Sequence, residues 1–74
     1  MGRDRLLKGL IRQQFLITLK TGEGFMGLLD EWDESTLQFV NAVAVSDDGQ
    51  RQKPVDGHLV LFRSNVAYMQ RTSP

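Results

Sequence analysis

The chain has 74 residues, with nine basic and nine acidic side chains, one histidine and no cysteine. A domain of this size has a marginal core of its own, and without cysteines or a second histidine neither disulfides nor a histidine-rich metal site is expected to support it. Self-association is therefore favoured. No apolar run approaches the ~20 residues that span a bilayer, so we expect a cytoplasmic protein with no membrane contact, no metal and no cofactor.

The N-terminal segment predicts a short helix over residues 5–14, with Asp4 as its N-cap. Gly9 weakens an isolated helix, so this one is expected to dock on the rest of the fold. An apolar stripe at helical spacing consists of Leu6, Leu7, Leu10 and Ile11. The other face is basic, and Arg5, Lys8 and Arg12 make it a candidate surface for nucleic acid; the alternative is an ordinary solvated surface.

From Phe15 the hydrophobic period changes to two, which predicts strands. A first strand leads into a hairpin turn over 21–24, and a second strand, 25–32, contains Gly27, which predicts a bend or bulge. A polar turn over 33–36 leads to a third strand, 37–45. On this strand Leu37, Phe39, Val43 and Val45 are expected on one face, interrupted by Asn41.

The second half of the chain begins with a polar loop over 46–57. Two short apolar strands follow within 58–70, and Ser64 and Asn65 form the turn between them. Residues 71–74 are expected to be a frayed tail.

Together these elements predict one domain over residues 1–74, a mostly β fold in which an N-terminal helix precedes a five-stranded, strongly bent antiparallel small barrel. Strands one to three occupy 15–45. The last two strands are short and apolar, and exposed apolar edges need a cover. Pairing of one subunit's edge with the next would close a ring; the alternative is an isolated barrel with a covered edge.

Two groups of residues resemble the motifs of the Sm and Sm-like (LSm) proteins, over roughly residues 5–70. The first motif is matched by Gly22, Gly27, Leu29, Trp32 and Asp33. The second is matched by Gly57, Leu59, Leu61, Val66, Tyr68 and Met69. This resemblance implies a homo-oligomeric ring, a hexamer or a heptamer, that binds single-stranded RNA.

The resemblance also implies where a base would bind. Family members hold it with an asparagine that closes the first motif and with an Arg-Gly pair in the second. Here Leu37, preceded by Thr36, stands at the asparagine position, and Phe62 and Arg63 stand at the pair, so we expect an altered base pocket. The candidate RNA-binding residues are Ser35, Thr36, Leu37, Phe62, Arg63, Ser64 and Asn65.

Each candidate also has a plainer interpretation. Phe62 could belong to the core, Arg63 could be a solvated turn residue, and Ser35 and Thr36 could be simple turn residues. A one-residue shift would give Arg63 the arginine role, with Ser64 for the glycine, and either Phe62 or Arg63 could stack a base.

The acidic residues after the second strand leave the function open. Carboxylates such as Glu31 and Glu34, repeated around a lumen, would repel RNA. The competing function is therefore a ring of the same fold that serves as a protein-assembly scaffold without specific RNA binding. A divalent-ion site at Asp30, Glu31, Asp33 and Glu34 is a weaker alternative to solvated charges. We expect no enzyme, because no nucleophile partners the histidine. The glycines at 22, 24 and 27 match the phosphate-binding pattern G-x-G-x-x-G only superficially, since that pattern needs a helix after it and a strand follows here.

Overall fold

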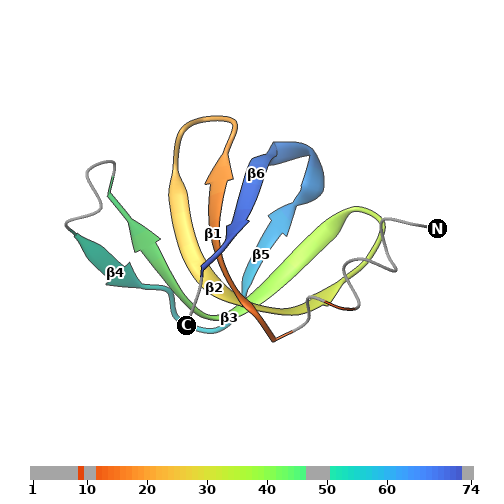
Figure 1. Ribbon diagram of the computed structural model, residues 1–74, viewed down its shortest axis with the longest axis horizontal. Helices are drawn as coiled ribbons and strands as arrows, with labels where there is room; N and C mark the ends of the chain where they lie inside the picture. The colour runs from red at the N-terminus through yellow and green to blue at the C-terminus, as the bar shows by residue number, and fades with distance from the viewer. Residues whose placement is uncertain (1–8, 10–11, 47–50, 73–74) are drawn as a thin grey trace.

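The computed structural model describes residues 9, 12–46 and 51–72. Within these residues the chain forms one bent antiparallel sheet and a short 3-10 helix (Figure 1). The elements are β1 (Gln14–Leu19), β2 (Gly24–Trp32), β3 (Thr36–Val45), β4 (Gln52–Pro54), β5 (Leu59–Phe62), η1 (Arg63–Asn65) and β6 (Val66–Arg71). No helix in this part of the chain is long and apolar enough to cross a membrane.

The central strand of the described sheet is β3, which pairs with β2, β4 and β5. β2 follows most of its length on one side, and β4 and β5 pair with its two ends on the other. The strand order is β4-β3-β2-β1-β6, with β5 also beside β3. Both β2 and β3 curve strongly (Figure 1), so the sheet folds back around its own apolar face.

The core forms where the period-two pattern places apolar side chains on the inner face of this sheet. Ile17, Leu29 and Phe39, from three neighbouring strands, have no exposed surface. The rest of the buried cluster is Phe15, Leu37 and Leu61. The predicted mostly β, strongly bent antiparallel fold is thus confirmed.

The bend depends on Gly27 in β2 and a bulge opposite it in β3. Leu28 pairs with Val40 and Met26 with Val43, so two residues of β3, Asn41 and Ala42, face Gly27 alone. Asn41 takes a left-handed conformation (φ 52°), which asparagine tolerates better than most residues. The extra residue reverses the alternation, so Ala42 is buried and Asn41 exposed. The predicted single face for the third strand is therefore wrong beyond Phe39.

Two predictions about individual elements also need correction. The predicted helix over 5–14 lies mostly outside the described residues, and its last residue, Gln14, starts β1 instead. The predicted loop over 46–57 contains a strand, because Gln52–Pro54 pairs with Val43–Val45. All three residues of β4 are exposed, so no hydrophobic alternation marks it in the sequence. The described sheet has six strands instead of five.

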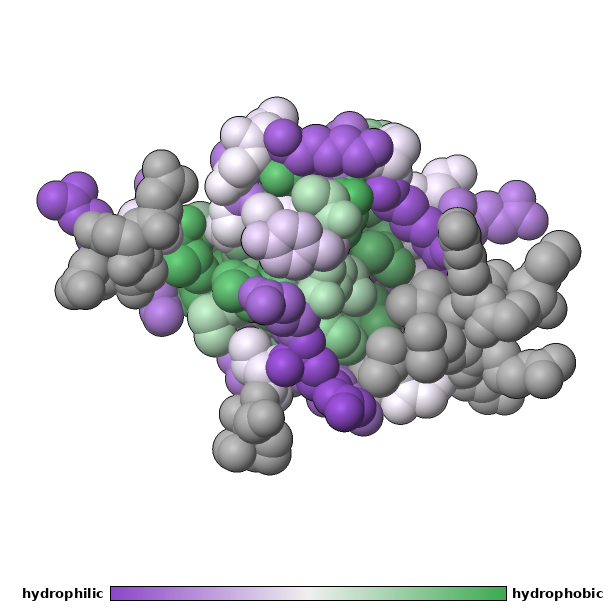
Figure 2. Space-filling model, turned by 45° about the horizontal axis from the view of Figure 1, so that its top comes forward, coloured by the Kyte–Doolittle hydropathy of each residue, from purple (hydrophilic) through white to green (hydrophobic). Residues whose placement is uncertain are grey.

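Within the described sheet, both β5 and β6 keep an unpaired edge. β5 pairs with β3 and β6 with β1, but no ladder joins β5 to β6, although only η1 separates them in the chain. The exposed large hydrophobic side chains of the described residues all stand on these two strands: Val60 (54% exposed), Phe62 (59%) and Tyr68 (55%). Hydrophobic surface gathers in the middle of the face shown in Figure 2. The unpaired edges of β5 and β6 can each pair with a further strand.

Candidate functional site

The turn between β2 and β3 is organised by the carboxylate of Asp33. Its Oδ1 accepts hydrogen bonds from the backbone N–H of Ser35 (2.8 Å), the backbone N–H of Thr36 (2.7 Å) and the Thr36 hydroxyl (2.9 Å). These bonds, the Ser35 one first, lower the pKa of Asp33 below its usual 3.8, and the positive charge of Arg63 adds to the effect. Asp33 therefore holds the turn in one shape. Its carboxylate is engaged by hydrogen-bond donors of the same turn.

The η1 turn lies directly beside this one. The backbone N–H of Arg63 donates to the Ser35 carbonyl (2.8 Å), and Thr36 pairs with Phe62 in the β3–β5 ladder. On the other side the Asn65 carbonyl accepts from the backbone N–H of Lys20 (2.8 Å). Segments about thirty residues apart in the chain are thus joined into one surface.

The predicted RNA-binding side chains differ in how accessible they are. Ser35, Ser64 and Asn65 are exposed. Thr36 is half-buried and its hydroxyl is committed to Asp33. Leu37 is 5% exposed and belongs to the core cluster, so its side chain cannot reach a ligand. Leu37 is thus a core residue in the position where the family resemblance implied a base contact.

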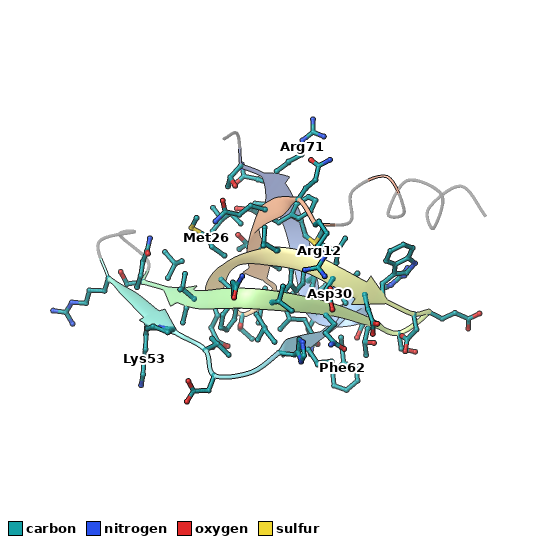
Figure 3. All side chains as sticks on the ribbon, turned by 90° about the horizontal axis from the view of Figure 1, so that it is seen from below. Arg12, Met26, Asp30, Lys53, Phe62 and Arg71 are labelled. Atoms are coloured by element: carbon teal, nitrogen blue, oxygen red, sulfur yellow. The ribbon has the colours of Figure 1, made fainter. Side chains whose placement is uncertain are left out.

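Phe62 and Arg63 lie at the end of the free β5 edge. The interpretation of Phe62 as a core residue is wrong: the side chain is 59% exposed and points away from the sheet (Figure 3). Arg63 is half-buried, and its charge acts on Asp33, so it is more than a solvated turn residue. An exposed aromatic ring therefore adjoins a half-buried arginine.

The acidic residues near the turn do not gather into a metal site. Among the described residues, no three histidine, aspartate or glutamate side chains lie close enough to hold an ion. Asp30 instead pairs with Arg12 at 3.3 Å, and the two side chains point toward each other in Figure 3. Glu31 and Glu34 are exposed, and Glu31, Trp32 and Gln38 are among the residues that line a small hollow of about 80 Å³.

The basic face predicted at the N-terminus is seen only in part, because Arg5 and Lys8 lie outside the described residues. Arg12 is 68% exposed despite its bond to Asp30. The structure adds Arg71, whose Nη1 donates to Gln13 Oε1 (3.3 Å). No pattern in the sequence pointed to this neighbour, because Arg71 comes near residue 13 only through the β1–β6 ladder, where it pairs with Phe15.

Comparison with solved structures identifies this architecture. A heptameric archaeal Sm protein is 21% identical, with a TM-score of 0.80 over 93% of this chain and 98% of that one. The P. aerophilum SmAP1 heptamer is 20% identical, with a TM-score of 0.85 over 100% and 97%. The SmAP (LSm) protein from Methanococcus vannielii is 25% identical, with a TM-score of 0.67 over 89% and 88%.

The chain has the Sm fold. The resemblance seen in the two sequence motifs is confirmed at the level of the fold by three structures that cover most of the chain. No protein-family model matches the sequence, and no curated protein matches it significantly.

Proposed function

We propose that this protein assembles into a closed homo-oligomeric ring, a hexamer or heptamer, that binds single-stranded RNA with an altered base pocket. It acts as a binding protein in the cytoplasm and not as an enzyme. The observation that carries the proposal is the junction of the two turns, where the Arg63 N–H bonds the Ser35 carbonyl and Phe62 stands exposed beside them.

The ring is supported by the two free strand edges. The β5 edge of one subunit and the β6 edge of the next can form an antiparallel ladder, which would bring Val60 near the neighbour's Tyr68 and cover both. Such a head-to-tail contact closes when the rotation per subunit fits. Two of the similar structures are heptamers.

RNA binding is supported by the chemistry of the joined turns. The Phe62 ring offers a stacking surface for a base, and Arg63 offers a cation for the base edge or phosphate. The exposed hydroxyls and amide of Ser35, Ser64 and Asn65 add donors and acceptors. Because the side chain at Leu37 is buried and apolar, we expect little discrimination of uridine from other bases.

Assembly is tested by native mass spectrometry at micromolar concentration. We expect a ring for the unchanged protein and loss of the ring for Val60→Lys, which adds a charge to the free β5 edge. Thr21→Lys, in the exposed hairpin turn, is the matched control and is expected to keep the ring. A monomeric unchanged protein would refute the ring.

RNA binding is tested by fluorescence anisotropy with labelled oligouridine, oligoadenosine and single-stranded DNA at low salt. Arg63→Ala is expected to weaken RNA binding and to lower the slope of log affinity against log salt by about 0.7 for each phosphate that the variant no longer neutralises. Arg51→Ala removes the same charge at the opposite end of β3 and is the control. No binding of any oligonucleotide would refute RNA binding.

The second candidate is a ring that serves as a protein-assembly scaffold. Two observations favour it: Leu37 is withdrawn into the core, and the exposed Glu31 and Glu34 put negative charge near the turns. A ring in the mass spectrum together with no oligonucleotide binding would support this candidate.

A further inference from the structure

The edge of β4 is a third unpaired strand edge in the described sheet. In this sheet β4 pairs with β3 alone and stands at one end of the strand order, apart from β5 and β6 (Figure 1). The proposed ladder between β5 and the neighbour's β6 leaves the β4 edge of every subunit uncovered. Because an uncovered edge can pair with another chain, β4 is a competitor of β5 for the β6 edge of a neighbour.

The hydrogen-bond pattern shows which backbone groups of β4 face β3. The backbone N–H of Ser46 donates to the Arg51 carbonyl (3.0 Å), and the backbone N–H of Val55 donates to the Ala42 carbonyl (2.9 Å). In an antiparallel ladder, every second residue turns its N–H and C=O toward the same neighbouring strand. Arg51 and Val55 therefore bond toward β3, and so does Lys53 between them.

The remaining two residues of β4, Gln52 and Pro54, direct their backbone groups to the free edge. Proline has no backbone N–H, so this edge keeps the donor of Gln52 and lacks a donor at Pro54. The ladder with β3 does not need that donor, and proline within sheets is confined to edges of this kind. A strand that approached the free edge of β4 would therefore find one of the two expected donors missing.

The free edge of β5 has no such gap. The Arg63 N–H donates to the Ser35 carbonyl at the end of the β3–β5 ladder, so by the same alternation Val60 and Phe62 direct their backbone groups outward. Neither of these residues is a proline, and each offers both a donor and an acceptor. A neighbour's strand can therefore form a more complete ladder with β5 than with β4.

Charge favours the same choice between the two edges. Arg51 and Lys53 are exposed, and the Lys53 side chain points away from the sheet in Figure 3. An antiparallel neighbour would bring Arg71, the last residue of its β6, to the start of the strand that it joins. The start of β4 carries these two cations, whereas β5 starts at Leu59. Like charges opposite each other on paired strands oppose the pairing.

We propose that Pro54 determines which edge this protein uses for assembly: by removing a donor from the free edge of β4, it restricts pairing between subunits to β5 and β6 and lets the ring close. The inference rests on the proposed ring. A neighbour that paired with β4 would join in a second orientation, and contacts that do not close by rotation grow into open chains. Short length, lysine and proline all protect strand edges, and the proline acts on the hydrogen bonds themselves.

The test restores the missing donor. Pro54→Val supplies an N–H at the free edge and leaves the groups that bond β4 to β3 unchanged. Light scattering after size-exclusion chromatography and native mass spectrometry give the mass over a range of protein concentrations. We expect the unchanged protein to keep the mass of one ring, and Pro54→Val to form species of at least about twice that mass, more of them at higher concentration. Pro54→Ala supplies the same donor with a smaller side chain and is expected to act in the same direction.

Two further variants separate the donor from the side chain. Gln52→Val places the same side chain on the same face of β4, because the two positions are two residues apart in a strand, and it leaves the edge donors unchanged. It is expected to keep the mass of one ring. Gln52→Pro combined with Pro54→Val moves the missing donor along the same edge and is expected to restore the mass of one ring. Circular dichroism checks that each variant is folded.

The outcomes distinguish this inference from the proposed ring. If the unchanged protein forms a ring and the folded Pro54→Val and Pro54→Ala variants keep its mass at every concentration, the inference is wrong and the ring stands. If Gln52→Val also grows beyond one ring, apolar surface and not the donor controls assembly, and the inference is overturned. If the unchanged protein is a monomer, the ring is refuted and the inference with it.

Discussion

Replacing Gly27 with alanine tests whether the bend of the sheet depends on a close approach between β2 and β3. A Cβ at this position would lie 3.2 Å from the Cβ atoms of Phe39 and Ala42 and 3.4 Å from the Ala42 Cα. None of these atoms can move away by side-chain rotation, because each is fixed to the backbone of β3. The strand would have to shift at the Asn41 bulge, and the fully buried Phe39 would shift with it.

The expected size follows from two opposing terms. Overpacking of a core costs about 1–3 kcal/mol, and replacing a strand glycine by alanine returns about 0.5–1 kcal/mol from the unfolded chain. Gly27→Ala should therefore lose up to about 2.5 kcal/mol. Gly24→Ala, three residues earlier in the same strand, meets no atom closer than 3.7 Å and should be neutral or more stable.

The two alanine variants are compared by thermal denaturation followed by circular dichroism. Their unfolded chains gain the same side chain, so the difference between them isolates the contacts in the fold. We expect Gly27→Ala to melt at least about 4 °C below Gly24→Ala. Protein concentration must be equal, because assembly stabilises the folded state. Equal melting temperatures, or a more stable Gly27→Ala, would show that β2 and β3 do not pack as closely as described.

Three further predictions concern the turns and the surface. Because the pKa of Asp33 is lowered in the folded state, its contribution is present above pH 3.8 and is lost as the pH falls through the lowered value; Asp33→Asn should flatten the acid side of a melting-temperature profile taken down to about pH 2. Asn41→Val should cost about 1–2 kcal/mol by chemical denaturation, since a β-branched residue resists the φ of 52°, while Asn41→Gly should not; equal costs would contradict the bulge. Arg12→Ala should change stability by less than about 1 kcal/mol, because the Arg12 side chain of the pair with Asp30 is 68% exposed, and a larger loss would show a structural role for this pair.

Much of this fold follows from local patterns in the sequence. The alternation of Phe15, Ile17 and their neighbours predicted β1, and Gly27 predicted the bend, because period and glycine act through the backbone close by. The family resemblance placed candidate residues in both turns, and the backbone N–H of Arg63 does bond the Ser35 carbonyl. These features depend on residues that are close together in the sequence and on the strand order that the family resemblance implies.

Other features depend on which strands lie side by side. β4 has no hydrophobic alternation, and only its backbone ladder with β3 reveals it. The bulge at Asn41 reverses a face because two residues oppose Gly27 across the sheet. The outer face has a hollow of about 290 Å³ at Gly24, because four neighbouring strands align this glycine with the side chains of Val45, Thr18 and Tyr68.

The sequence by itself determined the class of the fold, the position of its bend and the residues of its two turns, since each follows from the conformational preferences of neighbouring residues. The tertiary structure decided what those residues present to a partner. Leu37 is buried and Phe62 exposed because β5 pairs with β3 in a register that directs Leu61 inward. Exposure depends on cross-strand pairing, and cross-strand pairing is a property of the folded sheet.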